Sequence, residues 1–247
     1  GVEKRRVSLS DLTTNDAVVP STVDHVGIID HILRLLPATD HVAVVTGNSP
    51  NEKFWVESIS NELKPFTGRV TFTWHNELPF EDMLKRAAAL PPRSVILFIL
   101  MSVDAAGVSH EGKNVVNRLH AVANAPIFSW IDLDFGQGIV GGPLVPLVEV
   151  ASQVARVADR ILRGEVPSKI GIQPVGFGTP KYDWRELRRW DISESRLPPG
   201  SEIHFRNLTA WEQYRTWILL TLAALTAQAA LIGWLVYAVI TMLLTHA

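Results

Sequence analysis

Residues 41–63, HVAVVTGNSPNEKFWVESISNEL, decide the fold class. They begin with an uninterrupted apolar run at 41–46, which is typical of a β-strand buried on both faces of a parallel sheet. After a short loop, residues 51–63 carry apolar side chains at helical spacing: Phe54, Trp55, Ile59 and Leu63. The stretch therefore predicts a buried strand, a loop and a helix packed back onto the strand.

The same alternation continues along the chain. Further strand-like runs lie at residues 69–74, 94–100 and 126–131. Helix-like segments lie at residues 26–36, 81–90, 112–124 and 146–163. Continuous apolar strands that alternate with helices predict an α/β fold, with a parallel sheet flanked by helices on both faces.

Composition excludes several functional classes. The chain has 247 residues with 23 basic and 25 acidic side chains, a net charge of -2, so it lacks the basic surface of a nucleic-acid-binding protein. It contains no cysteine, which excludes a disulfide framework, a thiolate zinc site, an iron–sulfur cluster and a cysteine nucleophile. Hydrophobic residues make up 47%, which excludes a disordered chain.

The C-terminal region predicts a transmembrane helix. Residues 216–244 carry no charged side chain. As a helix they would extend about 43 Å, more than the ~30 Å hydrocarbon core of a bilayer. Trp211, Tyr214 and Trp217 lie at the front edge of this run, as interfacial aromatic residues would. A buried helix of a soluble domain is the alternative, but such helices rarely exceed ~20 residues without a charge. Gln228 is either tolerated in lipid or a helix–helix contact.

Three loops follow predicted strands and contain small polar residues and glycines. In a parallel sheet the ligand crevice lies beyond the carboxyl ends of the strands, so these loops form the candidate binding site. Its residues are Asn48, Ser49, Ser102, Asp104, Asp132, Asp134, Gly136 and Gly138. For Asn48 and Ser49 the alternative is that they only cap the following helix.

Enzyme and metal signals are weak. Asp132 and Asp134 could be paired carboxylates or ligands of a hard metal ion, but Phe135 and Gly136 follow where a calcium loop would supply further oxygen ligands. The sequence has no HExxH, GxSxG or phosphate-binding loop. We therefore expect no catalytic residue, no metal and no cofactor; an enzyme on a similar scaffold ranks last.

Four stretches carry a family resemblance: residues 42–55 (VAVVTGNSPNEKFW), 90–99 (LPPRSVILFI), 128–142 (FSWIDLDFGQGIVGG) and 182–214 (YDWRELRRWDISESRLPPGSEIHFRNLTAWEQY). The first three resemble one half of an ABC-type substrate-binding domain with the type I periplasmic-binding-protein fold. The fourth resembles the juxtamembrane segment of bacterial membrane-bound histidine kinases that use such a domain as their sensor. The resemblance spans roughly residues 42–236.

The resemblance implies a set of expectations for this chain. Residues 1–40 would be the remnant of a first lobe and a crossover, 41–180 the ligand-binding lobe, 181–215 a juxtamembrane segment and 216–244 the membrane span. The chain would be a piece of a longer receptor, anchored in the inner membrane by a single span with its soluble part in the periplasm.

The resemblance also implies roles for the site residues. Asn48 and Ser49 would make polar contacts to a small-molecule ligand, Asp104 and Asp132 would bind its amine or hydroxyl groups, and Gly136 and Gly138 would shape the backbone. The implied function is small-molecule sensing, with closure of an interlobe cleft relayed to the membrane helix. A transmembrane kinase would be expected to form a homodimer. The alternative is a membrane-tethered substrate-binding component of an ABC transporter.

Overall fold

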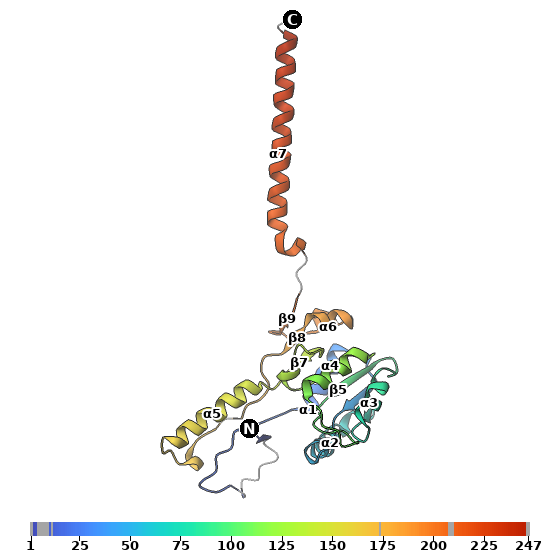
Figure 1. Cartoon of the computed structure of the whole chain (residues 1–247), viewed down its shortest axis with the longest axis vertical. Helices are drawn as coiled ribbons and strands as arrows, with labels where there is room; N and C mark the ends of the chain where they lie inside the picture. Colours follow the sequence, from blue (N-terminus) through green and yellow to red (C-terminus); the bar gives the residue numbers. More distant parts are fainter. Residues whose placement is uncertain (1, 4–9, 11, 173, 207–209, 246–247) are drawn as a thin grey trace. The chain divides into compact units, whose positions relative to one another are not determined.

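The structure is a computed structural model, and it describes residues 2–3, 10, 12–172, 174–206 and 210–245. The chain divides into two compact units, Gly1–Phe205 and Arg206–Ala247 (Figure 1). The first unit contains all the strands and the shorter helices of the described chain, and the second contains one long helix.

A parallel sheet forms the centre of the first unit. Its strands lie in the order β4 (Thr71–Trp74), β3 (His41–Val45), β5 (Ser94–Phe98) and β6 (Ile127–Phe128). All neighbouring pairs are parallel. The strand–helix alternation in the sequence therefore predicted the fold class correctly.

Helices cover both faces of this sheet, which explains the continuous apolar strands. They are α1 (His25–Leu35), α2 (Pro50–Glu62), α3 (Phe80–Ala87) and α4 (Gly112–Val122). Val42 and Val44 of β3 belong to one apolar core with α1 and α2. Ala43 and Val45 belong to a second core with α3 and α4. Successive side chains of a strand point to opposite faces, so a strand between two cores is apolar throughout.

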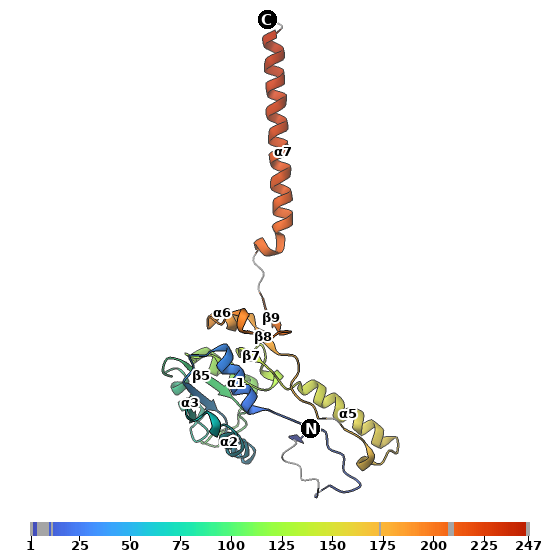
Figure 2. The same cartoon turned by 180° about the vertical axis from the view of Figure 1, so that it is seen from behind.

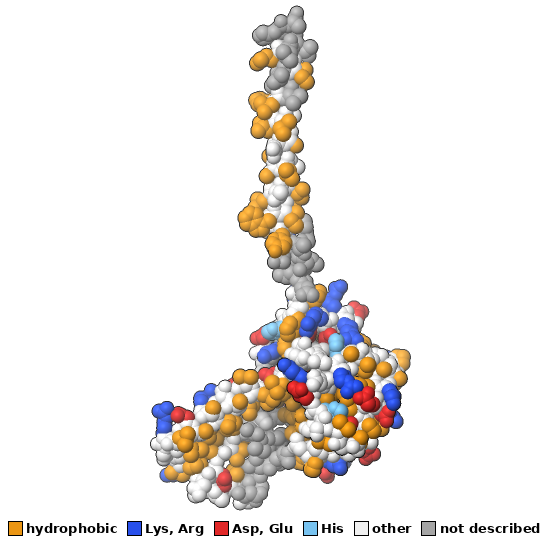
Figure 3. All heavy atoms as spheres, viewed as in Figure 1, with side chains coloured by type: hydrophobic (Ala, Val, Ile, Leu, Met, Phe, Trp, Pro, Cys, Tyr) orange, Lys and Arg blue, Asp and Glu red, His pale blue; other side chains and the backbone are white. Residues whose placement is uncertain are grey.

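Helix α5 (Leu147–Leu162) contacts the core of the central sheet only near its start, through Leu147 and Val150. It shares a small core with Val19 and Ile170, beside the short parallel strands β1 (Val2–Glu3) and β2 (Pro20–Ser21) (Figures 1 and 2). Other apolar side chains of α5 are uncovered, since Val148 is 70% exposed and Leu162 is 86% exposed. Apolar side chains are visible along this helix in Figure 3.

The segment after α5 pairs with a short strand that precedes α5. Strands β7 (Gly141–Gly142), β8 (Lys181–Asp183) and β9 (Glu202–His204) form a second, mixed sheet, with α6 (Trp184–Arg189) after β8. Tyr182 of β8 is fully buried, and its hydroxyl lies 2.6 Å from Nε2 of His31 on α1. Short 3-10 helices are η3 (Lys64–Phe66), η4 (Asp132–Asp134), η5 (Pro167–Lys169) and η6 (Glu194–Arg196). The segment before α7 is thus an integral part of the first unit.

The second unit is helix α7 (Ala210–Thr245), which is long and apolar enough to cross a membrane. Its candidate span, Tyr214–Met242, has 29 residues and a mean hydropathy of 1.9 (Figure 3). The hydroxyl of Thr221 donates to the carbonyl oxygen of Trp217 at 2.8 Å, so this polar group is satisfied within the helix, as a lipid environment requires. The side chain of Trp211, predicted to lie at the interface, is outside the described ones.

Candidate functional site

The loops that follow β3 and β5 are hydrogen-bonded to each other at the carboxyl edge of the sheet. The amide of Gly47 donates to the carbonyl oxygen of Leu100 at 2.8 Å, and the amide of Asn48 donates to that of Val103 at 2.7 Å. The hydroxyl of Thr46 donates to Leu100 as well, at 3.0 Å. The first two predicted site loops therefore form one layer, as parallel strands dictate.

Glu52 joins these two loops from inside the protein. Its side chain is fully buried, and its carboxylate accepts the amide of Ser49 at 2.7 Å and the amide of Ser102. A Cβ atom at Gly47 would lie 2.5 Å from the same carboxylate, so only glycine fits there. Our sequence analysis missed Glu52, although Ser49 and Glu52 have the S-x-x-E spacing of a capping box, which would have found it.

Ser49 has a structural role in this arrangement. It is the N-cap of α2, and its hydroxyl accepts the amide of Glu52 at 3.4 Å, which completes the capping box. The structure thus shows the capping role that the sequence left as an alternative for Ser49. Asn48 is half-buried beside it, and Ser102 is exposed.

Asp104 is buried and bonded to its own loop. Its carboxylate accepts the amides of Phe80 at 3.0 Å, Ala106 at 2.9 Å and Val108 at 3.0 Å, and lies 3.0 Å from Nε2 of His110. Burial by itself raises the pKa of Asp104, but these hydrogen bonds outweigh it and hold the pKa at about 2. The carboxylate thus anchors the loop after β5 to the start of α3. That Asp104 binds an amine or hydroxyl of a ligand stays a prediction.

A cavity of about 330 Å³ lies where the loops after β5 and β6 meet the start of α4. Its lining residues are Phe98, Ile99, Leu100, Glu111, Gly112, Lys113, Ile131, Leu133 and Asp134. The wall is mostly apolar with a few polar groups, as small-molecule sites are, and the volume falls within their usual range. Of the predicted site residues, Asp134 lines this cavity.

Asp134 has an unusual environment. Burial raises its pKa to about 6; the charge of Asp132 adds to the effect, and the hydrogen bond from Ser129 opposes it. The hydroxyl of Ser129 donates to Asp134 Oδ2 at 2.5 Å. Near neutral pH the carboxyl can therefore be present in both protonation states, so it can accept or donate a hydrogen bond. The carboxylate of Asp132 has another partner: its Oδ1 accepts the amide N–H of Leu147, the first residue of α5, at 3.1 Å.

Gly136 and Gly138 allow close approach between parts of the protein. Both have positive φ angles, of 81° and 106°. A Cβ atom at Gly138 would lie 2.3 Å from Cγ of His120 on α4, and one at Gly136 would lie 2.9 Å from the ring of Phe205. The predicted role in shaping the backbone thus serves contacts within the protein.

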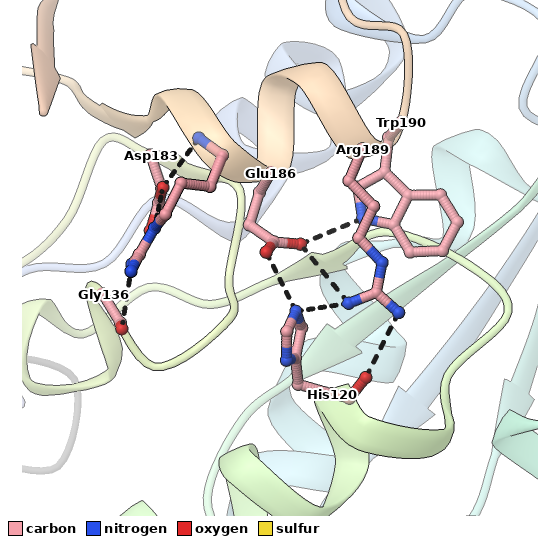
Figure 4. Close-up of polar contacts among 7 residues, drawn as sticks. His120, Gly136, Asp183, Glu186, Arg189 and Trp190 are labelled. Carbon is pink, nitrogen blue, oxygen red and sulfur yellow. Dashed lines mark hydrogen bonds and ion pairs between the residues drawn. The ribbon is translucent and has the colours of Figure 1, made fainter. Parts of the chain in front are cut away.

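The loop of residues 132–138 also contacts the last residues of the first unit. The ring of Phe135 lies 5.4 Å from that of His204 and 5.5 Å from that of Phe205. The guanidinium of Arg185 lies 4.4 Å from the centre of the Phe205 ring, and its Nη2 donates to the carbonyl oxygen of Gly136 at 3.3 Å (Figure 4). One loop therefore links the cavity, through Leu133 and Asp134, to His204 and Phe205, the last residues of the first unit.

In the part of the chain that the structure describes, no group of three or more histidine, aspartate or glutamate side chains is placed to hold a metal ion.

The comparisons with known proteins identify the fold. No protein-family model matches the chain, and no curated protein matches it. Among solved structures, the chain resembles a conserved domain protein from Vibrio cholerae (14% identity) and an ABC domain in complex with L-Trp from Streptococcus pneumonia (13%). It also resembles a ligand-free, open substrate-binding protein with adhesive properties from Clostridium difficile (11%).

Each of these likenesses has a TM-score of 0.56 and covers 76% of this chain. The chain spans 61–62% of the length of those structures. The fold predicted from the family resemblance, that of substrate-binding proteins, is therefore confirmed.

Proposed function

We propose that this chain binds a small molecule at the carboxyl edge of its parallel sheet and relays binding to a membrane-spanning helix, as the sensing part of a membrane-anchored receptor. The soluble unit would lie outside the cytoplasm, and α7 would cross the inner membrane once. The histidine-kinase context of the family resemblance belongs to this proposal, as does the homodimer expected of such a receptor.

One observation carries the proposal: a single loop contacts both the cavity and the segment before α7. Leu133 and Asp134 line the cavity, and the next residue, Phe135, packs its ring on His204 and Phe205. A ligand that moves the first pair would shift Phe135 as well, because Phe135 is the next residue and its ring packs on those of His204 and Phe205. A pure storage or delivery protein would not need this connection.

We further propose that α5 and residues 12–21 belong to a first lobe, the rest of which faces the cavity. Three segments that would connect the two lobes are hydrogen-bonded to one another. The amide of Thr22 donates to the carbonyl oxygen of Val175 at 3.1 Å, and the amide of Gly178 donates to the carbonyl oxygen of Leu144 at 2.9 Å. The exposed apolar side chains of α5 are the surface such a lobe would cover. Asp132, bonded at the start of α5, would then lie at the hinge.

Ligand binding is tested with the full chain in lipid nanodiscs by a thermal-shift screen. The compounds are amino acids, with L-tryptophan first, then organic acids and aromatic compounds. A ligand at a hundredfold excess over its Kd stabilises the native state by about 2.7 kcal/mol. Leu133→Arg, which places a long cation at the cavity wall, is expected to abolish the shift. Val122→Arg is the matched control, since Val122 is 41% exposed at the other end of α4. A shift that survives Leu133→Arg places the ligand elsewhere and refutes this site.

The relay is tested by hydrogen–deuterium exchange. Ligand is expected to slow exchange both in residues 131–138 and in residues 202–205. Phe135→Ala should keep the first effect and lose the second, whereas Phe72→Ala, a half-buried phenylalanine on β4, should keep both. Protection confined to residues 131–138 in the unmodified chain would favour the alternative, a membrane-tethered substrate-binding component of an ABC transporter.

A further inference from the structure

A cavity of about 570 Å³ lies at the amino edge of the parallel sheet, at the opposite end of the strands from the candidate site. Thr39, Ser94 and Pro126 line it, and they lie at or just before the first residues of β3, β5 and β6. Trp190 and Arg196, from the segment after α6, complete the wall. The volume is within the usual range of small-molecule sites.

Most of the side chains in this wall are apolar. Leu90 is buried, and Leu36 and Trp190 are half-buried. The indole N–H of Trp190 donates to Glu186 at 3.2 Å (Figure 4), so the one polar group of the ring is satisfied inside the protein. An aromatic or aliphatic body is therefore the part of a ligand that this wall favours.

The charged groups of the wall are cationic. They are Arg93 and Arg196, and no acidic side chain of the described residues belongs to the wall. Arg93 forms an ion pair with Asp40, which lies outside the wall. Arg196 donates from Nη1 to the carbonyl oxygen of Leu35, the last residue of α1, at 3.0 Å, and within the described part of the chain it forms no ion pair. Since a guanidinium has five N–H groups, most of the hydrogen-bonding capacity of Arg196 is left for an anion.

The backbone of Arg93 indicates a function for its side chain. Its φ is 65°, in the left-handed region where glycine is normally found. A non-glycine residue in this conformation costs stability and is typical of sites where the side chain is needed. The ion pair with Asp40 does not account for an arginine here, because both side chains are exposed and such pairs contribute little to stability.

We propose that this cavity is a binding site for a small monoanion with an aromatic body. Arg93 and Arg196 would bind its acidic group, and Leu90 and Trp190 would contact its apolar body. Such a ligand would join the amino edge of the sheet to the segment after α6. The inference does not rest on the proposed function, because the two cavities lie at opposite edges of the sheet.

The test uses the full chain in nanodiscs of phosphatidylcholine, a lipid without net charge, with the signal of empty nanodiscs subtracted. Binding of benzoate, 2-naphthoate and indole-3-acetate is titrated at neutral pH by ligand-observed NMR. Indole-3-acetamide has the aromatic body of indole-3-acetate without its charge. It is expected to bind at least about tenfold more weakly, the factor that one charge-assisted hydrogen bond gives. Tryptamine, which has the same body and a positive charge, is expected not to bind.

Four variants assign the binding to this cavity. Arg196→Gln should weaken the binding of the anions at least about tenfold. Arg93→Gly should weaken it as well without lowering the melting temperature, because glycine removes the left-handed strain. Asp40→Asn should tighten it, because the carboxylate that competes for Arg93 is gone. Arg188→Gln is the matched control, since Arg188 is exposed on α6 outside the wall, and it should leave the affinity unchanged.

The position of the bound anion separates this inference from the proposed function. The anion should slow hydrogen exchange in residues 90–94 and 190–197, and Leu133→Arg should leave its affinity unchanged. Loss of binding in Leu133→Arg, with protection of residues 131–138, would place the anion in the other cavity; that result overturns this inference and supports the proposed function. The inference is also overturned if none of the three anions binds, if indole-3-acetamide binds as tightly as indole-3-acetate, or if neither Arg196→Gln nor Asp40→Asn changes the affinity.

Discussion

Replacement of Glu52 by glutamine tests whether one buried carboxylate holds the two binding loops together. The carboxylate accepts one amide with each oxygen, from Ser49 at 2.7 Å and from Ser102. Glutamine keeps one acceptor oxygen but turns an N–H₂ group toward the other amide. One charge-assisted hydrogen bond is then lost and a buried donor left unpaired.

The expected loss follows from these contacts. A hydrogen bond to a charged group contributes about 1.5–3 kcal/mol, and the remaining bond to a neutral oxygen is weaker. Glu52→Gln should therefore lower the free energy of unfolding of the first unit by about 3 kcal/mol. For a unit of 150–250 residues this corresponds to a melting temperature lower by roughly 6–12 °C.

Urea unfolding, followed by tryptophan fluorescence, and a thermal melt measure the loss in the full chain. Glu57→Gln is the matched control, because Glu57 lies on the same helix with its side chain exposed, and it should change stability by less than about 0.5 kcal/mol. Hydrogen exchange at residues 46–50 and 100–104 should rise together in Glu52→Gln. A loss no larger than that of the control, or faster exchange in only one loop, would refute the role of Glu52.

Three further changes have expected outcomes. Asp104→Asn should cost about 1.5–3 kcal/mol at pH 7. Because the pKa of Asp104 in the folded chain, about 2, lies below its ordinary value of 3.8, this contribution is present above pH 4 and disappears as the pH falls to 2. Urea unfolding at pH 7 and pH 2 should therefore show the variant's deficit shrinking. The pH dependence expected for Asp134 has the opposite sign. Its pKa in the folded chain, about 6, lies above the ordinary 3.8, so its protonation adds stability as the pH falls from 7 to 4. Asp134→Asn should therefore be about 2 kcal/mol more stable than the unmodified chain at pH 7 but not at pH 4, and equal effects at both would contradict the argument. Gly138→Ala should destabilise by at least about 2 kcal/mol, because its φ is 106° and the new Cβ would overlap His120, whereas Gly112→Ala, with open space around it, is the control in the same thermal melt.

The sequence by itself determined the architecture of the central layer and the long apolar C-terminal helix. Continuous apolar strands such as 41–46 have one physical solution, a parallel sheet between two helical layers, and the observed β3 (His41–Val45) differs from that run by one residue. The uncharged C-terminal run likewise predicted α7 from length and hydropathy alone. These features depend on local periodicity, which one sequence displays completely.

The candidate site could be predicted only as a region. The rule that ligands bind beyond the carboxyl ends of parallel strands found the three loops, but the use of each side chain depends on partners far away in the sequence. Asp104 is held by Phe80, and the loop amide of Ser102 by Glu52, over separations of 24 and 50 residues. Hydrogen-bond partners are fixed by folding, so polarity and spacing cannot separate a structural carboxylate from a ligand-binding one.

Only the tertiary structure decided where α5 belongs and how the cavity connects to the last residues of the first unit. The apolar face of α5 predicts burial, but the sequence does not say against which layer. In the structure Val150 near its start joins the core of the central sheet, whereas Val157 packs with Val19 and Ile170. The contact of Phe135 with Phe205 spans 70 positions and leaves no local pattern. The periodicity of a sequence predicts which face of a helix or strand is buried. It does not predict which residues cover that face, because those contacts form between segments far apart in the sequence when the chain folds.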